Sequence, residues 1–188
     1  EIDYIFEHKI ELIRKSADRL GIDIIKAKTD AMREKYAGKI EVLFGIEIGW
    51  NAAVHDFEIE FSHRYPFDMI ILALHGRPEG DTVDRRFDTY LDWCCNAAAA
   101  FGNYDTFAHV DYVLRYIGHT DLSVHREKLT KLFNILISQG KALEINTKQA
   151  PDPQALERIE YILSLYTQLG GEKLTIGSDA HSVAVYRN

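Results

Sequence analysis

Five short apolar runs recur along the chain, and each is rich in Val, Ile and Leu. Apolar and polar residues do not alternate strictly within them, which is typical of strands that are buried on both faces of a parallel sheet. The pattern therefore predicts strands at Glu41–Glu47, Asp68–His75, Thr106–Asp111, Ala142–Asn146 and Leu174–Asp179.

Between these runs, apolar residues recur three and four positions apart, which is the period of an amphipathic helix. Helices are predicted at Lys9–Leu20, Thr29–Tyr36, Val83–Ala100, Leu129–Ser138 and Pro153–Leu169. Thr29 is a candidate N-cap, and Gly21 and Gly140 are candidate C-caps. Strands that alternate with helices in this way indicate an α/β fold with a parallel sheet or barrel.

Composition narrows the class of protein. The 188 residues are 46% hydrophobic and 27% charged, which is typical of one globular domain spanning residues 1–188. The net charge of −7, with no basic run longer than two residues, argues against nucleic acid as a partner. No stretch of about eighteen apolar residues predicts a membrane span, and the N-terminal residues do not resemble a signal peptide.

The cysteines bear on the compartment. Cys94 and Cys95 are adjacent, and adjacent cysteines rarely pair with each other. We therefore expect two free thiols inside a helix and a reducing, cytoplasmic location.

Polar residues able to bind a metal or a substrate stand at or near the end of every predicted strand. They are Glu47, His75, His109, Asn146, and Asp179 with His181. On a parallel barrel the carboxyl ends of the strands share one rim, so these side chains would form a ring. Carboxylates and imidazoles are ligands for Zn, Mn and Fe.

Each residue also has a plainer interpretation. Glu47 alone could be an exposed acid at a strand end, and His75 a core histidine with a hydrogen-bond partner. His109 could bond to Asp111 or to the backbone. Asp179 could be an N-cap followed by a surface histidine, His181. The metal interpretation depends on the whole ordered set.

The ordered set resembles a known family. Gly45-Ile46-Glu47, Leu74-His75, Ala108-His109-Val110-Asp111, the strand ending Glu144-Ile145-Asn146-Thr147, and Gly177-Ser178-Asp179-Ala180-His181 occur in this order. They resemble motifs of the polymerase and histidinol phosphatase (PHP) superfamily, and within it the histidinol-phosphatase-like phosphoesterases. The resemblance extends from about Lys9 to His181.

The resemblance implies a distorted seven-stranded (β/α) TIM-like barrel with up to three divalent metals (Zn, Mn or Fe) at its rim. It implies that Glu47 bridges two metals and that His75 and His109 complete one site. Asp179 would serve a second metal and His181 a third, and both would act in catalysis. A hydroxide generated on the metals would attack phosphorus, and His181 could protonate the leaving group.

The implied activity is that of a phosphomonoesterase acting on a small phosphorylated substrate, with L-histidinol phosphate expected on resemblance alone. Arg115 could clamp the phosphate, and Asn146 could contact the substrate. Two alternatives remain open. One is a PHP-type nuclease, which the missing basic stripe disfavours, and the other is a degenerate domain without catalysis.

The chain departs from the family pattern in one respect. Members open with a strand and His-x-His, and a further Asp-His ends their second strand, but neither motif is present here. One hypothesis is that segments are missing near residues 4–5, 24–27 and 182–183; the other is a natural truncation. In either case we expect the site of Glu47, His75 and His109 to be the most complete.

The remaining histidines and the tryptophans are assigned no chemistry. The histidines lie in charged helical or loop segments and are predicted at the surface: His8, His55, His63, His119 and His125. Trp50 and Trp93 are interpreted as packing residues.

Overall fold

The sheet is parallel and follows chain order. The computed structural model describes residues 21–182, and its five-stranded sheet has the order β1-β2-β3-β4-β5. All four neighbouring pairs are parallel. The strands are β1 (Gly45–Gly49), β2 (Met69–Ala73), β3 (Thr106–Phe107), β4 (Ala142–Asn146) and β5 (Leu174–Gly177).

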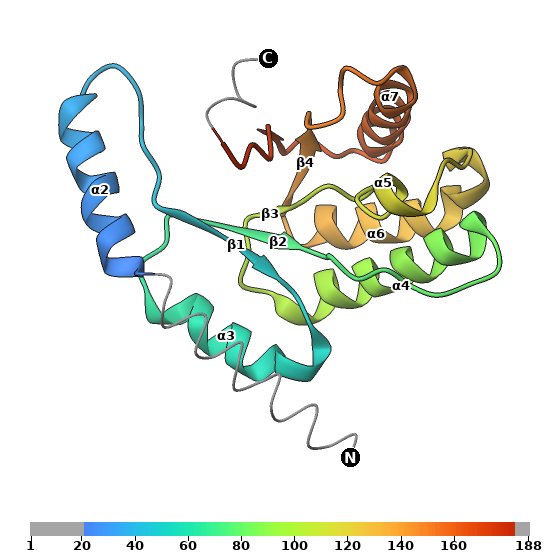
Figure 1. The fold of residues 1–188 in the computed structure, drawn as a ribbon, viewed down its shortest axis with the longest axis horizontal. Helices are drawn as coiled ribbons and strands as arrows, with labels where there is room; N and C mark the ends of the chain where they lie inside the picture. Colours follow the sequence, from blue (N-terminus) through green and yellow to red (C-terminus); the bar gives the residue numbers. More distant parts are fainter. Residues whose placement is uncertain (1–20, 183–188) are drawn as a thin grey trace.

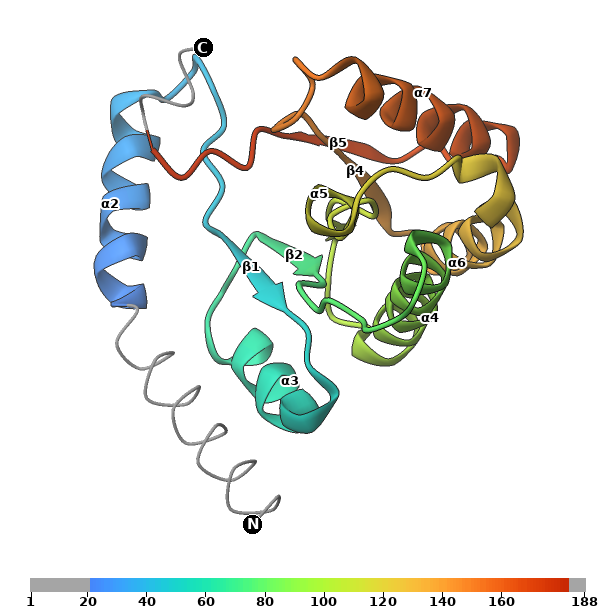
Figure 2. The same cartoon turned by 45° about the vertical axis from the view of Figure 1, so that its right-hand side comes forward.

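Helices connect the strands. They are α2 (Ile22–Lys35), α3 (His55–Arg64), α4 (Val83–Phe101), α5 (Leu114–Ile117), α6 (Arg126–Ser138) and α7 (Pro153–Gln168), with short 3-10 turns η1 (Ala52–Val54) and η2 (Leu122–His125). Figure 1 shows α4, α6 and α7 gathered on one side of the molecule, while α2 stands apart beyond β1, and Figure 2 shows the same separation. The α/β class with a parallel sheet is confirmed, but five strands are seen among the described residues rather than seven.

The larger of two apolar clusters among the described residues holds the sheet against α4, α6 and α7. Leu72, Phe107 and Leu143 from three adjacent strands are fully buried, and α4 and α6 pack on them through Leu91, Leu132 and other side chains. Burial of each such side chain contributes about 1.5–3 kcal/mol. The predicted thiols are confirmed, since Cys94 and Cys95 are free and buried on α4.

Two helices begin where the pattern predicts and end within one residue of the predicted position. The Thr82 hydroxyl accepts from the backbone N–H of Arg85 and starts α4, and Gly102 with φ 69° follows its end. Asp152 caps α7, with Pro153 in its first turn.

Other boundaries differ from prediction. The first strand is Gly45–Gly49 rather than Glu41–Glu47, because its pairing with β2 runs from Gly45 and Met69 to Gly49 and Ala73. Glu47 therefore lies inside the strand and not at its end. The third strand ends at Phe107, because the backbone turns to φ 25° at His109. The helix expected from Thr29 begins at Ile22, so Thr29 is not a cap and instead donates its hydroxyl to the Ile25 carbonyl.

The three places where segments were hypothesised to be missing lie only partly within the described residues. Residues 24–27 lie inside α2, where the Ile25 N–H bonds to the Gly21 carbonyl at 3.1 Å, so no second strand starts there. Residues 4–5, the helix Lys9–Leu20 and His8 lie outside the described residues, as does residue 183. No helix of the described part is long and apolar enough to span a membrane.

Candidate metal centre

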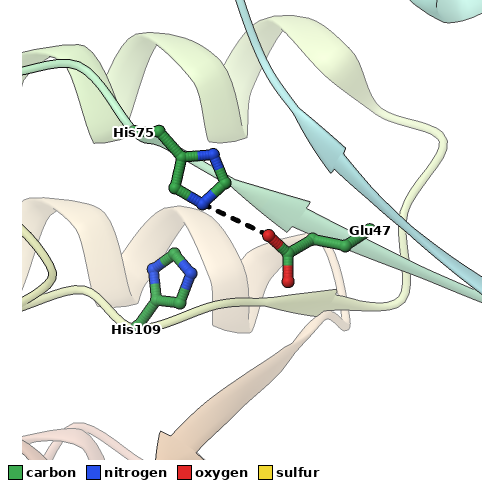
Figure 3. Close-up of side chains that lie close together, drawn as sticks. All are labelled: Glu47, His75 and His109. Carbon is green, nitrogen blue, oxygen red and sulfur yellow. Dashed lines mark ion pairs between the residues drawn. The ribbon is translucent and has the colours of Figure 1, made fainter. Parts of the chain in front are cut away.

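Three donors from adjacent strands meet at the carboxyl edge of the sheet. Glu47 lies on β1, His75 follows β2 and His109 follows β3. One ligand atom from each lies within 4.8 Å of the other two. The three side chains point toward one another in Figure 3, where the dashed line joins Glu47 Oε1 to His75 Nε2 at 3.2 Å. One carboxylate and two imidazoles form a donor set that suits Zn, Mn or Fe.

The local backbone explains why His75 stands where it does. Ile71 and Leu72 belong to β2, and the chain leaves the sheet at Leu74. The Leu74 carbonyl accepts a hydrogen bond at 2.9 Å from the buried hydroxyl of Tyr90 on α4. The residue that precedes His75 is therefore fixed to the core.

His109 is buried, and its environment favours the neutral ring. Burial lowers the pKa of His109 to about 4, so the imidazole carries no proton charge near neutral pH. Its Nδ1 atom has no hydrogen-bond partner within residues 21–182. A neutral imidazole with an unpartnered nitrogen is the form that binds a metal, so His109 fits the donor set.

Glu47 is held in its ionised form. The hydrogen bond from His75 lowers the pKa of this carboxyl, although burial opposes the shift. The group therefore offers a carboxylate beside two imidazoles, and no Lys or Arg among the described residues forms an ion pair with Glu47.

Glu144 was missed by the sequence analysis as a site residue. It lies on β4, and its Oε2 accepts from the backbone N–H of His109 at 3.0 Å and from Asn146 Nδ2 at 3.2 Å. Gly177 on β5 makes room for it, because a Cβ at that position would overlap the Glu144 carboxylate. The available signal in the sequence was an acidic residue in the middle of a strand that is predicted to be buried.

Tyr112 was also missed. Its ring centroid lies 4.9 Å from that of His75 and 5.0 Å from that of His109, so it packs against both imidazoles. The ring centroid of Tyr116 lies 5.2 Å from that of Tyr112, and the Arg77 guanidinium lies 3.6 Å from the Tyr116 centroid. These aromatic residues form one wall of the candidate site.

Asp179 lies beyond the end of β5 and is neutralised there. Its Oδ2 is 2.8 Å from Arg115 Nη1 and 3.1 Å from Lys148 Nζ, and its Oδ1 is 2.9 Å from His181 Nε2. Burial alone would raise the pKa of Asp179, but the hydrogen bonds from these three residues hold it at about 2. Within the described residues, Asp179 and His181 are not part of the three-donor group.

The route by which Asp179 and His181 come together differs from the predicted one. They were expected on one face of an extended strand, but β5 ends at Gly177 and Asp179 has φ 48°. The two side chains are nevertheless hydrogen-bonded, and His181 is 80% exposed.

Arg115 and Asn146 are adjacent but occupied. Arg115 on α5 donates Nη1 to Asp179 and Nη2 to Asn146 Oδ1 at 2.9 Å, and its side chain is only 8% exposed. Both terminal nitrogens of the guanidinium therefore bond to protein partners, whereas the buried Nε has no partner among the described residues.

One surface prediction is wrong. His125 is buried, with Nδ1 2.7 Å from Asp88 Oδ1 and Nε2 3.1 Å from the Thr120 hydroxyl. These partners tie η2 to α4 and satisfy the ring, so His125 is a structural histidine. His63 and His119 are exposed as predicted, whereas His55 is half-buried and accepts from Trp50.

The fold and this rim define an α/β protein with a candidate divalent-metal site at the carboxyl edge of a parallel sheet. The family model of the PHP domain matches residues 8–148. The chain belongs to the PHP domain family.

Its relatives include named phosphatases. The histidinol-phosphatase of Lactococcus lactis is 30% identical over 165 residues, which cover 80% of this chain and 61% of that protein. A probable histidinol-phosphatase of Thermotoga maritima is 32% identical over 148 residues, covering 76% and 58%. The chain thus spans about three-fifths of the length of these relatives.

A solved structure is also similar. The crystal structure of histidinol phosphate phosphatase from Lactococcus lactis, complexed with Zn, L-histidinol and phosphate, matches with a TM-score of 0.78 and 28% identity. The match covers 86% of this chain and 67% of that one. The parallel sheet is therefore of the kind found in a PHP histidinol phosphatase.

Proposed function

We propose that this chain is a metal-dependent phosphomonoesterase that hydrolyses L-histidinol phosphate to histidinol and phosphate. The observation that carries the proposal is that ligand atoms of Glu47, His75 and His109, from three adjacent strands and the segments after them, lie within 4.8 Å of one another. Membership of the PHP family and relatives named histidinol-phosphatase support the choice of substrate.

The metal residues have defined tasks in this proposal. Glu47, His75 and His109 hold a divalent ion, and Asp179 and His181 hold further ions when all three positions are filled. Zn is the first candidate, because it is present in the similar crystal structure, with Mn and Fe as alternatives. A bound ion lowers the pKa of water and neutralises charge on the phosphoryl oxygens.

The chain itself handles the proton and the substrate. When His181 holds no ion, Asp179 Oδ1 orients its exposed ring through Nε2, and Nδ1 can carry the proton needed by the leaving alkoxide. Arg115 and Asn146 bind the phosphate. Arg115 bonds to Asp179 through Nη1 and to Asn146 through Nη2, and its Nε, which has no partner among the described residues, is the donor left for the phosphate.

The wider architecture is part of the proposal. Residues 1–188 form one domain, and the five described strands belong to a distorted seven-stranded barrel whose His-x-His and Asp-His segments are missing from the sequence. Two free, buried cysteines support a reducing, cytoplasmic location.

Phosphate release from L-histidinol phosphate tests the function. We expect turnover with added Zn or Mn and none after chelation, with turnover restored when metal is returned. The degenerate-domain alternative has a specific support, since one three-donor group is found among residues 21–182. One bound metal equivalent without turnover at any metal concentration would establish that alternative instead.

A further inference from the structure

A cavity of about 520 Å³ opens directly beside the metal residues. It lies between the segment after β1, the segment after β2 and helix α4. His75 forms part of its wall, so the cavity and the candidate metal centre share a side chain. The chain contains two tryptophans, and both of them, Trp50 and Trp93, line this cavity.

The Trp50 side of the cavity is rigidly built. The backbone N–H of Trp50 donates to the Ala73 carbonyl at 2.9 Å, and its indole Nε1 donates to His55 Nδ1 at 3.1 Å. The next residue, Asn51, is held by its own N–H, which donates to Glu58 Oε2 at 3.1 Å. Hydrogen bonds therefore hold both the backbone and the indole nitrogen of Trp50.

Two glycines leave room for the rings that line the cavity. A Cβ at Gly76 would lie 2.9 Å from Cζ3 of Trp93, and a Cβ at Gly49 would lie 3.0 Å from His75 Nδ1. Side chains at these positions would press on the rings that line the cavity. Trp93 remains 36% exposed on α4, although a large apolar residue gains more from full burial.

The lining chemistry favours a planar, neutral ring. Trp50, Trp93 and Leu74 offer apolar contact, and the amides of Asn51 and Asn96 offer hydrogen bonds. Among residues 21–182, no Lys, Arg, Asp or Glu lines the cavity, so these residues offer no ionic partner to a charged group there. Stacking on indole is a common way of binding heteroaromatic rings.

We propose that this cavity binds the heteroaromatic ring of the alcohol part of the substrate, while the phosphate lies at the metal residues. The proposal rests on the proposed function for the nature of the substrate. In this proposal Trp93 and Trp50 determine the specificity among phosphate esters. Gly76 leaves room in the cavity because it has no side chain.

Tryptophan emission provides a direct test, because both tryptophans report on this cavity. The metal-loaded chain is titrated with L-histidinol, which has the ring but no phosphate. We expect a saturable change in emission, and a fit to the titration gives the dissociation constant. In Gly76→Ala, where the new methyl group presses on Trp93, we expect this constant to rise about tenfold.

Kinetics separate a specificity role from a structural one. In Trp93→Leu we expect KM for L-histidinol phosphate to rise about tenfold, with kcat within about twofold. Hydrolysis of an aliphatic phosphomonoester such as glycerol phosphate should be unchanged. Val124→Ala, an exposed apolar residue on η2 away from the cavity, is the matched control and should alter neither substrate.

The two proposals fail in different ways. Phosphatase activity combined with no emission change, or equal loss on both substrates in Trp93→Leu, would overturn the cavity assignment alone. A saturable response to L-histidinol without hydrolysis of any phosphate ester would support the cavity and overturn the proposed function.

Discussion

The two sides of the sheet's carboxyl edge carry similar residues in different electrostatic states. On the β1–β3 side, Glu47 faces two imidazoles and no cation neutralises it among the described residues. On the β4–β5 side, Asp179 also faces an imidazole, but Arg115 and Lys148 form ion pairs with it. The carboxylate on the β1–β3 side is thus an available metal ligand, whereas the carboxylate on the β4–β5 side is already part of an internal ion pair.

The difference shows that residue type and strand position do not define a metal ligand by themselves. A carboxylate can bind a metal only when the gain exceeds the loss of its present partners. For Glu47 the loss is small, because the ion pair found for it among the described residues is with His75, which is itself a ligand for the same ion. Asp179 must first give up Arg115, whose guanidinium is nearly buried.

The largest effect should come from removing the carboxylate of the β1–β3 side. In Glu47→Gln, Zn affinity measured by competition with a chelator should fall at least about 100-fold, because a neutral amide replaces the charged ligand. Phosphate release should fall with it. Glu60→Gln on α3, an exposed acid paired with Arg64, is the matched control and should leave both unchanged. Retention of full metal affinity in Glu47→Gln would remove the basis of the comparison.

The next effect should come from the β4–β5 side. Arg115→Met leaves Asp179 nearly buried with only Lys148 and His181 as partners, so urea unfolding should show a loss of about 3 kcal/mol. Zn affinity at the Glu47 group should change less than tenfold. Arg85→Met removes an exposed ion pair with Asp81 and should cost below about 0.5 kcal/mol. A 100-fold change in Zn affinity in Arg115→Met would show that the two sides act as one site.

A smaller effect should come from the residue that joins the two sides. Gly177→Ala places a methyl group on the Glu144 carboxylate, which must then release the backbone N–H of His109. We expect a loss of stability of about 1–3 kcal/mol and a loss of Zn affinity of about tenfold. Ser178→Ala, next to Gly177 in the chain, is the control. Another Gly→Ala change, such as Gly102→Ala, would strain the backbone, because φ is 69° there. Unchanged Zn affinity in Gly177→Ala would show that Glu144 does not position His109.

The smallest effect depends on pH and concerns the support of the segment after β1. Burial raises the pKa of Glu58 to about 7, from a usual 4.5, and its side chain is 7% exposed. Between these two values the folded state binds more protons than the unfolded state, so this contribution to stability falls as pH rises and is fully lost above about 7. The shift corresponds to at most about 3 kcal/mol.

Glu58→Gln removes the ionisation while leaving an acceptor for the Asn51 N–H. Relative to the parent chain, the variant should gain about 1–2 kcal/mol in urea unfolding at pH 8.5 and nothing at pH 4. Glu60→Gln again serves as control, since that acid is exposed. An equal difference at both pH values would show that burial does not raise the pKa of Glu58.

The sequence was sufficient for features that depend on neighbouring residues. The strand Ala142–Asn146 and the helix from Pro153 are found as predicted, because apolar runs and caps are local signals. The segment His55–Arg64 was assigned no element, although it forms α3. Its alternation of Phe57, Glu58 and Ile59 lacks a helical period, and its buried residue Phe61 packs with Ile22 and Phe44, which lie far from it in the sequence.

The arrangement of the rim was predictable, but the state of its groups was not. Strand order brings Glu47, His75 and His109 together, since parallel neighbours end at one edge. The ion pair of Arg115 and Asp179 joins residues 64 positions apart. The burial of His125 similarly depends on Asp88 and Thr120, which no local pattern reveals.

The order of the strands has a consequence for how the chain is made. Because the sheet follows the sequence, a ribosome delivers Glu47, His75 and His109 before it has synthesised either β4 or β5. Folding and ion capture are coupled when the ligands come from separate elements. An ion bound at this stage would hold the first three strands of the nascent chain together. The strands β4 and β5 would then pair onto the β3 edge of a sheet whose register is already set.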